Sequence, residues 1–141
     1  MRCLLPVLTL VLAACGVGHV ADSAADLKAM QGTWTLTGST FNGNSVMADL
    51  QWIVDGDHYR IRYNRQMDPF PLKITLDAAT RHLDAAHDLA PGANPRSEFK
   101  GLYEVSGDTL RVCLDLRGQR YPESFDAPAG SKLVVYRFKR Q

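Results

Sequence analysis

Cysteine is scarce in this chain of 141 residues, which has three, at positions 3, 15 and 113. Cys3 and Cys15 lie near the N-terminus, so the folded part holds one thiol, and one thiol cannot form an internal disulfide. The domain must therefore depend on a hydrophobic core for its stability. We expect Cys113 to be a small packed side chain, because no His or Lys lies within several residues to lower its pKa and activate it.

The chain also lacks a large net charge of either sign. The chain has 16 Lys and Arg residues against 15 Asp and Glu residues, which gives a formal net charge of +1. A nearly neutral chain without a run of basic residues lacks the surface that attracts nucleic acid. We therefore expect no nucleic-acid partner. The length fits one domain, and there is no internal repeat.

Recognisable catalytic motifs are absent as well. There is no Gly-x-Ser-x-Gly sequence, no phosphate-binding loop and no Cys-x-x-Cys pair. The carboxylates of Glu98, Glu104 and Glu123 are not spaced as an acid–base pair. The sequence therefore predicts a protein that is not an enzyme and has no cofactor.

One group of side chains resembles a metal-ligand set: His82, Asp84, His87 and Asp88. On a strand, His82 and Asp84 would share one face and His87 would point to the other, so the three converge only if the chain turns at residues 85–86. A metal site needs several ligands in a fixed geometry. We therefore expect solvated side chains here and no metal site.

A long apolar run is lacking too. The run from Leu4 to Ala14 contains eleven uncharged residues, whereas a helix that spans a bilayer needs about 20. A short apolar run that follows a basic residue and ends in small side chains fits a secretory signal.

The end of this run, Leu12-Ala13-Ala14-Cys15-Gly16, resembles the bacterial lipoprotein signal, in which small residues precede an acceptor cysteine. The resemblance implies cleavage before Cys15 and acylation of its sulfur, and two acyl chains make a stable membrane anchor. Glycine after the cysteine, where aspartate would favour the inner membrane, points to the outer membrane. The alternative is a soluble secretory protein in which Cys15 is incidental.

The expected organisation follows from this signal. We expect a signal peptide at residues 1–14, a lipidated N-terminus and tether at 15–24, and one folded domain at 25–141. The expected location is the bacterial cell envelope, on the periplasmic face of the outer membrane, with the membrane as a partner through the N-terminal lipid.

What the chain does contain is a series of segments rich in β-branched and aromatic residues, separated by turn signals at 42–43, 55–57, 77–80 and 106–108. In the stretch from Leu110 to Leu116, apolar residues alternate with Arg111, Cys113 and Asp115, which predicts one buried and one solvated face. The segments lie at 33–41, 49–64, 72–85, 97–116 and 132–140.

A short helix is expected before these segments. Asp22 or Ser23 can cap it, and Leu27 and Met30 lie three apart on one face.

Seven or eight strands joined mainly by tight turns form an antiparallel meander, and closing the sheet removes its exposed edges most simply. A sandwich of two sheets is the alternative, but it needs longer crossover connections, which occur only at residues 64–71 and 86–97. The sequence therefore predicts an all-β fold, an antiparallel up-and-down β-barrel of about eight strands with a short N-terminal helix.

The ends of the domain predict how the barrel closes. Gly32 and Trp34 open the first strand, and Arg137 lies in the last one. Because the first and last strands of such a barrel pair, we expect the Arg137 guanidinium to stack on the Trp34 indole, a contact worth about 1–2 kcal/mol when partly desolvated. Gly32 would let the backbone enter the barrel floor beneath the helix. This Gly-x-Trp with a C-terminal Arg resembles the lipocalin kernel.

A wider resemblance, over about residues 26–140, is to an uncharacterised bacterial lipocalin-like domain family. It is carried by DLKAMQGTWTLTGSTFNGNSV, by FKGLYEVSGDTLRVCLD and by the closing SKLVVYRFKR. Ser106-Gly107-Asp108 stands where members often have an aspartate-glycine-aspartate turn. These motifs are turns, a strand and a barrel closure, so the resemblance implies the fold and not an activity.

Two functions are compatible with this fold. In the first, the lipid-anchored barrel holds a small apolar or amphipathic ligand in its mouth. A barrel of about eight strands either fills its interior with side chains or encloses one small ligand. The candidate lining residues are Trp52, Tyr59, Tyr63, Phe99 and Tyr103.

In the second, the barrel is filled, and the domain is an anchored protein-interaction or inhibitor module. It would contact an envelope protein through Arg60 and Arg62 or through the loops at 67–71 and 90–95. A large apolar pocket would favour ligand binding, whereas a packed interior with an exposed apolar patch would favour the interaction role.

Overall fold

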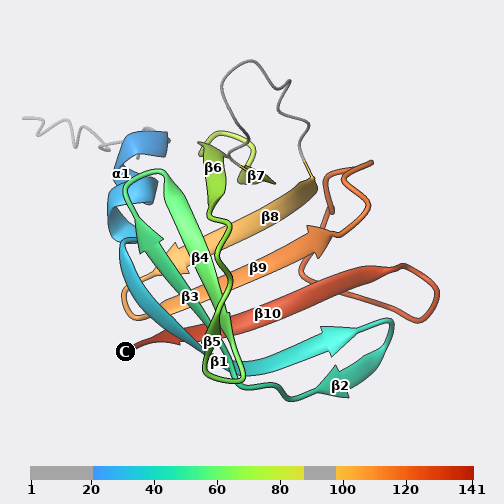
Figure 1. The fold of residues 1–141 in the computed structure, drawn as a ribbon. Coiled ribbons are helices and arrows are strands. Elements are labelled where there is room, and N and C mark those ends of the chain that lie inside the picture. The colour runs from blue at the N-terminus through green and yellow to red at the C-terminus, as the bar shows by residue number, and fades with distance from the viewer. Residues whose placement is uncertain (1–20, 88–97) are drawn as a thin grey trace, which may run out of the picture.

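The structure, a computed structural model, describes residues 21–87 and 98–141. The predicted signal peptide, Cys15, Asp88 and the loop at 90–95 lie outside the described residues. One short helix precedes the strands (Figure 1). The elements are α1 (Ser23–Ala29), β1 (Gly32–Phe41), β2 (Asn44–Val46), β3 (Leu50–Asp55), β4 (His58–Tyr63), β5 (Gln66–Met67), β6 (Leu72–Asp77), β7 (His82–His87), β8 (Phe99–Ser106), β9 (Thr109–Asp115) and β10 (Leu133–Arg140).

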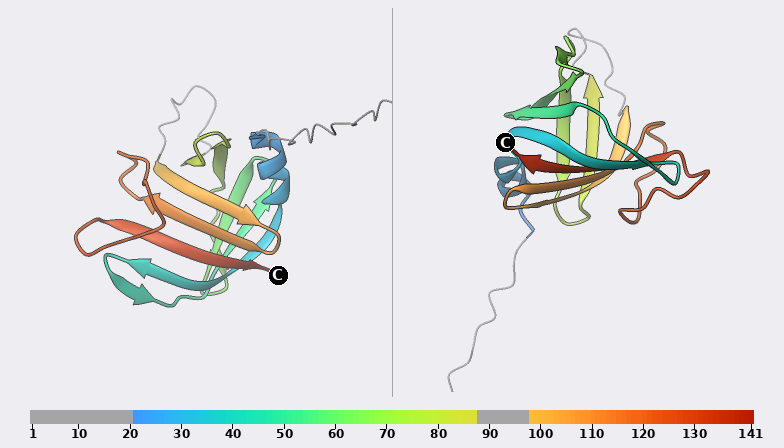
Figure 2. Two further views of the ribbon diagram at one scale, coloured as in Figure 1. Left: turned by 180° about the vertical axis from the view of Figure 1, so that it is seen from behind. Right: turned by 90° about the horizontal axis from the view of Figure 1, so that it is seen from below.

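The strands form a closed antiparallel β-barrel, which confirms the predicted fold class. The ring follows the order of the chain, β1-β3-β4-β6-β7-β8-β9-β10, and β10 pairs with β1 to close it. The two short strands β2 and β5 extend β1 and β4 as hairpins. Figure 2 shows β8, β9, β10 and β1 side by side as one wall of the barrel.

Two irregularities shape the ring. The pairing of β1 with β10 shifts register between Leu36 and Gly38, and such a bulge bends a strand. The pairing of β4 with β6 is short, with the Cα partners His58–Lys73 and Tyr59–Leu72. Beyond Tyr59, β4 stays paired with β3, but its other edge pairs with β5 and no longer with β6. The barrel wall is therefore interrupted between β4 and β6.

The helix α1 covers one end of the barrel. Its N-cap is Asp22, whose carboxylate accepts hydrogen bonds from the backbone N–H groups of Ala24 and Ala25 at 3.0 and 3.2 Å. Of the two predicted caps, Asp22 is therefore the one used. The Tyr103 hydroxyl donates to Asp26 Oδ2 of the helix at 2.6 Å, and the Trp34 indole Nε1 donates to the Met30 carbonyl at 2.8 Å.

The turns between β3 and β4, β6 and β7, and β8 and β9 lie at this helix-covered end, which we call the closed end. Gln31 bonds to Gly56 in the first of these turns, and Ser23 Oγ accepts from the Ala78 N–H in the second. The connections β1–β2, β4–β5 and β9–β10 lie at the other end, which we call the open end (Figure 1).

The barrel interior is packed with large side chains. Trp52 lies at its centre, with ring centroids at 4.6 Å from Tyr59, 4.9 Å from Phe138 and 6.0 Å from Tyr136. The fully or nearly buried core residues include Met30, Trp34, Leu36, Trp52, Val54, Tyr59, Leu72, Ile74, Leu83, Ala85, Tyr103, Leu110, Val112, Leu114, Val134 and Phe138.

The outer face of β9 differs from the prediction at Asp115. Cys113 is buried, as expected for a small packed side chain, but Asp115 is buried as well, where the alternation predicts a solvated side chain. In a second cluster, Cys113 and Val135 pack with Ala127 and with the partly buried Phe125. The segment between β9 and β10 folds back over the outer wall and brings Phe125 and Ala127 there.

Candidate functional site

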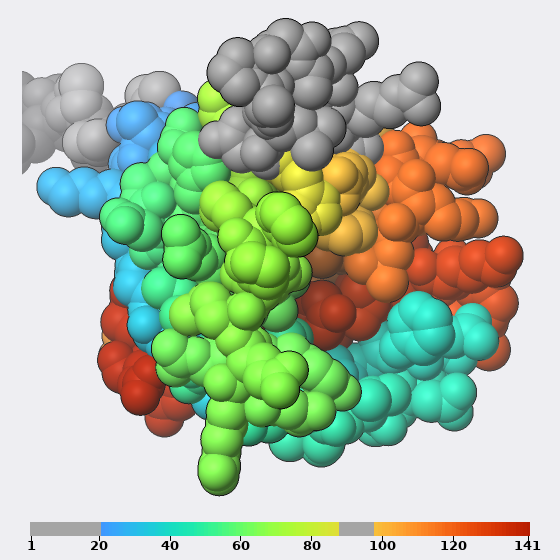
Figure 3. Space-filling view, in the orientation of Figure 1, coloured from blue at the N-terminus to red at the C-terminus, as the bar shows by residue number. Residues whose placement is uncertain are grey.

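An apolar groove lies at the open end of the barrel and is our candidate site. Its volume is about 290 Å³. Figure 3 shows the hollow between the β1–β2 strands, in cyan, and the β4–β5 strands, in green, with β10, in red, seen in its depth. The lining residues are Leu36, Ser39, Phe41, Val46, Ala48, Leu50, Tyr63, Leu116, Val134 and Tyr136.

Strand alternation and register place this lining. On β1, Ser39 and Phe41 follow the bulge and lie opposite Tyr136 and Val134 of β10. The Ser39 hydroxyl donates to the Val46 carbonyl and is thereby occupied. Within the lining, side-chain hydroxyls for a ligand therefore come from Tyr63 and Tyr136, and the remaining surface is almost wholly apolar.

The floor of the groove is the packed interior. Burial raises the pKa of Tyr136. Burial, with smaller contributions from Tyr136 and Glu98, also raises the pKa of Tyr59. Both phenols are therefore neutral at physiological pH and can form hydrogen bonds.

The five predicted lining residues have different places. Trp52, Tyr59 and Tyr103 are buried to 1% exposure or less and form part of the filled interior. The hydroxyl of Tyr103 is bonded to α1 at the closed end. Phe99 packs against the core from a partly buried position. Tyr63, which is 54% exposed, is the one of the five that lines the groove.

The other lining residues were harder to find in the sequence. Alternation along a strand indicates which face a side chain occupies, but not its height along the barrel axis. Phe41, Val46 and Leu116 lie at or just beyond strand ends, beside turns, where the alternating pattern stops. The signal that marks them in the sequence is a large apolar side chain next to a turn.

The prediction that the first and last strands pair is confirmed, but the prediction that Arg137 stacks on Trp34 is wrong. The strands β1 and β10 pair, but the guanidinium over Trp34 belongs to Arg140, with Cζ at 4.3 Å from the ring centroid. Arg137 is opposite Gly38 and donates to Thr40 Oγ1 on the outer surface. Gly32 has φ +112°, and a Cβ there would lie 3.3 Å from the Arg140 guanidinium, so glycine suits this close approach.

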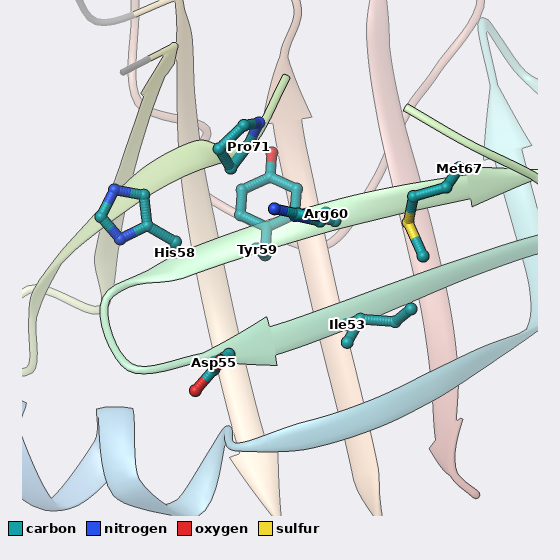
Figure 4. A pocket seen from close by; sticks show the side chains of 7 residues that line it. All are labelled: Ile53, Asp55, His58, Tyr59, Arg60, Met67 and Pro71. Atoms are coloured by element: carbon teal, nitrogen blue, oxygen red, sulfur yellow. The ribbon is translucent and has the colours of Figure 1, made fainter. Parts of the chain in front are cut away.

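A second hollow, of about 550 Å³, lies on the outer face of β3 and β4 (Figure 4). It is lined by a mixture of charged and apolar side chains, Ile53, Asp55, His58, Tyr59, Arg60, Met67 and Pro71. His58 is paired with Asp57 at 2.7 Å. No Ser, Thr or Cys among the lining residues could act as a nucleophile beside this pair. The groove is the better candidate because its lining is apolar and carries no charged side chain.

The side chains of His82, Asp84 and His87 do not converge. On the outer wall, the His82 ring stacks on Tyr121 at 3.8 Å, and Asp84 accepts hydrogen bonds from the Tyr121 hydroxyl and from Lys100 at 2.6 and 3.2 Å. His87 instead contacts Glu98, with Nδ1 and Oε2 2.5 Å apart. Within residues 21–87 and 98–141, no group of three or more His, Cys, Asp or Glu side chains is placed to hold a metal ion.

Comparison of the chain with models of protein families, with curated proteins and with solved structures finds no match. In the described part of the chain, no helix is both long and apolar enough to cross a membrane.

Proposed function

We propose that this chain is a lipoprotein of the bacterial cell envelope, with a lipocalin-like barrel that binds one small apolar or amphipathic ligand at its open end. The observation that supports ligand binding is the groove of about 290 Å³, with its apolar walls and its two tyrosines. Ligand pockets usually measure about 300–1,000 Å³, so this groove has the size for a single slender molecule.

The shape of the groove narrows the class of ligand. The packed rings of Trp52, Tyr59 and Phe138 stop a ligand from passing down the barrel axis. A fatty-acyl or isoprenoid-like chain could lie along the apolar wall with its polar end beside the hydroxyl of Tyr63 at the exposed margin. Nucleotides and free metal ions have no matching charged partners in this lining.

The alternative function also has an observation in its favour. A packed interior combined with exposed apolar side chains at the open end is what an anchored interaction or inhibitor domain would show. Under this alternative, the groove would receive a side chain of an envelope protein and no small molecule would bind with saturation.

Filling the groove should abolish ligand binding. Ala48 lies in the lining and is not part of the fully buried core, so Ala48→Trp places an indole in the groove. In a chain that begins at residue 21, which keeps α1 and every strand, we expect an environment-sensitive fluorescent fatty acid to bind with saturation. The Ala48→Trp variant should weaken this binding at least tenfold, which corresponds to about 1.4 kcal/mol.

The matched control is Ala79→Trp, the same substitution at an exposed position in the β6–β7 turn of the closed end. It should bind the probe like the parent chain. If the parent chain shows no saturable signal, or if both variants lose it equally, the groove is not a ligand site and the interaction role becomes the better proposal.

Replacing the proposed acceptor cysteine should prevent anchoring. We expect Cys15→Ser to leave a precursor that is neither lipidated nor cleaved before residue 15, because the hydroxyl cannot replace the thiol as the acyl acceptor. Mass spectrometry of the N-terminal peptide and membrane fractionation after a salt wash test this. A Cys15→Ser protein that matures at the same position and stays in the membrane would contradict lipidation.

A further inference from the structure

Two tyrosine hydroxyls inside the barrel have no hydrogen-bond partner among the described residues. They belong to Tyr59 and Tyr136, whose phenols have pKa values raised by burial, with no hydrogen bond contributing to either shift. By contrast, the hydroxyls of Tyr103 and Tyr121 each donate to a carboxylate at 2.6 Å. Because buried tyrosine hydroxyls usually have a partner, these two exceptions call for an explanation.

The oxygen of Tyr136 is the one that a ligand in the groove can reach. Within residues 21–87 and 98–141, no side-chain nitrogen or oxygen that is sealed from solvent lacks a hydrogen-bond partner. The two phenol oxygens must therefore retain some accessible surface. Tyr136 lines the groove and Tyr59 does not, so the Tyr136 hydroxyl is available to a molecule bound there.

The pairing of β1 with β10 places Tyr136 deeper in the groove than its apolar neighbours. Tyr136 is the Cα partner of Ser39, whereas Val134 is the partner of Phe41, nearer the tip of the β1–β2 hairpin. The Tyr136 ring also reaches the packed interior, with its centroid 6.0 Å from that of Trp52. The inner end of the groove therefore offers a hydroxyl, and its outer part is apolar.

No cation faces this inner hydroxyl from the lining, which contains no charged side chain. The arginines next in the chain to the two groove tyrosines are directed to the outer surface. Arg62 donates to Gln51 at 3.2 Å, and Arg137 donates to Thr40 at 3.1 Å. An ionised carboxylate at the inner end would lose its water without gaining an opposite charge, which is costly.

We propose that the groove selects a ligand whose polar end is uncharged and that this end binds the hydroxyl of Tyr136. A neutral hydroxyl or carbonyl oxygen would take the inner position, and the apolar chain would run outwards between Phe41 and Val134. An ionised carboxylate would stay at the exposed margin beside Tyr63, where water keeps it hydrated. This inference rests on the proposed ligand binding and names the head group that the same site prefers.

The two tyrosines of the groove should differ in their effect on specificity. Tyr63 is 54% exposed, so a hydrogen bond from a ligand only replaces one from water and adds little. The Tyr136 hydroxyl lies in an apolar recess, where a ligand without a polar group would leave it unpaired. A site that hydrogen-bonds a ligand oxygen discriminates against analogues that lack this oxygen. Tyr136 should therefore set the specificity.

Photolabelling of the whole chain can locate the head group. Decanol and decanoate, each with a diazirine in the chain, are titrated onto protein reconstituted in phosphatidylcholine vesicles, at a pH where the acid is ionised. The half-saturating concentration is compared among the parent, Tyr136→Phe and the matched control Tyr63→Phe. Each substitution removes one hydroxyl and keeps the ring. Because all variants meet the same lipid, partition of the probe into the vesicles cancels in the ratios.

We expect both probes to label the parent chain with saturation and Ala48→Trp, which fills the groove, to weaken this labelling. Tyr136→Phe should raise the half-saturating concentration of decanol about fivefold, the effect of one neutral hydrogen bond. Tyr63→Phe should raise it less than about twofold. For decanoate, Tyr136→Phe should also change it less than about twofold, because the ionised end stays at the margin.

Three outcomes would overturn the proposal. Saturable decanol labelling that Tyr136→Phe leaves unchanged would show that the head group lies elsewhere, while ligand binding at the groove would stand. An equal rise for decanoate in Tyr136→Phe would show that an ionised end also reaches this hydroxyl, so the groove does not select for charge. If neither probe labelled the parent chain with saturation, this inference and the proposed ligand binding would both be wrong.

Discussion

Replacing Trp34 by alanine should lower the free energy of unfolding by about 3–5 kcal/mol, the usual cost of removing a large core aromatic. Trp34 has no exposed surface, and its Nε1 donates to the Met30 carbonyl at the end of α1. The substitution therefore leaves a cavity at the closed end and removes a hydrogen bond that holds the helix. Denaturant unfolding of the chain that begins at residue 21 measures this change.

Arg140 should be the coupled partner of Trp34. Its guanidinium lies 4.3 Å from the Trp34 ring centroid and donates to the Ala29 carbonyl at 2.6 Å, and its Nε is 3.3 Å from Asp108 Oδ1. We expect Arg140→Ala to cost about 2–3 kcal/mol, because hydrogen bonds from a charged group contribute about 1.5–3 kcal/mol. The double variant should cost less than the sum of the two, since residues in contact do not add.

Arg137→Ala is the matched control, three residues earlier on the same strand. Arg137 is exposed and contacts Thr40 on the outer surface, so its removal should cost less than about 0.5 kcal/mol and add to Trp34→Ala. Strict additivity of Arg140→Ala with Trp34→Ala, or a larger coupling for Arg137, would contradict the closure that the structure shows.

The sequence pattern of the last strand distinguishes Arg140 from Arg137. Tyr136, Phe138 and Arg140 alternate with Arg137 and Lys139, so Arg140 shares the inward face and Arg137 does not. The period of two was therefore enough to choose Arg140. The strands, the turn at Asn42-Gly43 and the antiparallel order were likewise predictable, because each depends on local backbone preferences and on burial of one face.

The groove and the covered outer wall depend on contacts that have no periodic signature. Alternation placed Trp52 and Tyr59 inside correctly, but whether inward rings leave a cavity depends on how they stack, and here they fill the interior. Alternation alone predicts that Asp115 is solvated, because the outer face of such a strand usually meets water. A segment rich in proline and glycine covers that face instead, and nothing in its composition says where it packs.

Asp115 holds this covering segment, and Asp115→Ala should cost about 3 kcal/mol. The carboxylate is 1% exposed. It accepts hydrogen bonds from the backbone N–H groups of Arg117 and Arg120 at 2.9 and 3.2 Å and from Arg117 Nε at 3.3 Å. Alanine would leave these donors without their acceptor, and hydrogen bonds to a charged group contribute about 1.5–3 kcal/mol.

The same carboxylate should make stability depend on pH. Burial favours its neutral form, but the N–H groups of Arg117 and Arg120 and the Arg117 guanidinium outweigh this effect, so the pKa of Asp115 lies below its usual 3.8. A pKa that is lower in the folded state contributes stability above the unfolded value, and this contribution is lost as the pH falls through the folded pKa. The Asp115→Ala variant should therefore lose less stability on acidification than the parent chain.

Cys113 reports locally on whether the segment has opened. In the chain that begins at residue 21 it is the one cysteine. Burial, with the charge of Asp126, raises the pKa of its thiol to about 11. Since the thiolate is the reactive form, a thiol reagent should label the folded parent chain slowly. Asp115→Ala should label at least tenfold faster, the change expected when opening becomes about 1.4 kcal/mol easier.

Glu123→Gln is the control for this last experiment. Glu123 is exposed in the same covering segment, and its replacement by glutamine removes one negative charge, as Asp115→Ala does. It should unfold and label like the parent chain. If Asp115→Ala loses stability while the labelling rate of Cys113 below the unfolding transition is unchanged, the carboxylate does not hold the segment against the barrel. If Glu123→Gln accelerates labelling as much, net charge and not the hydrogen bonds of Asp115 keeps the outer wall covered.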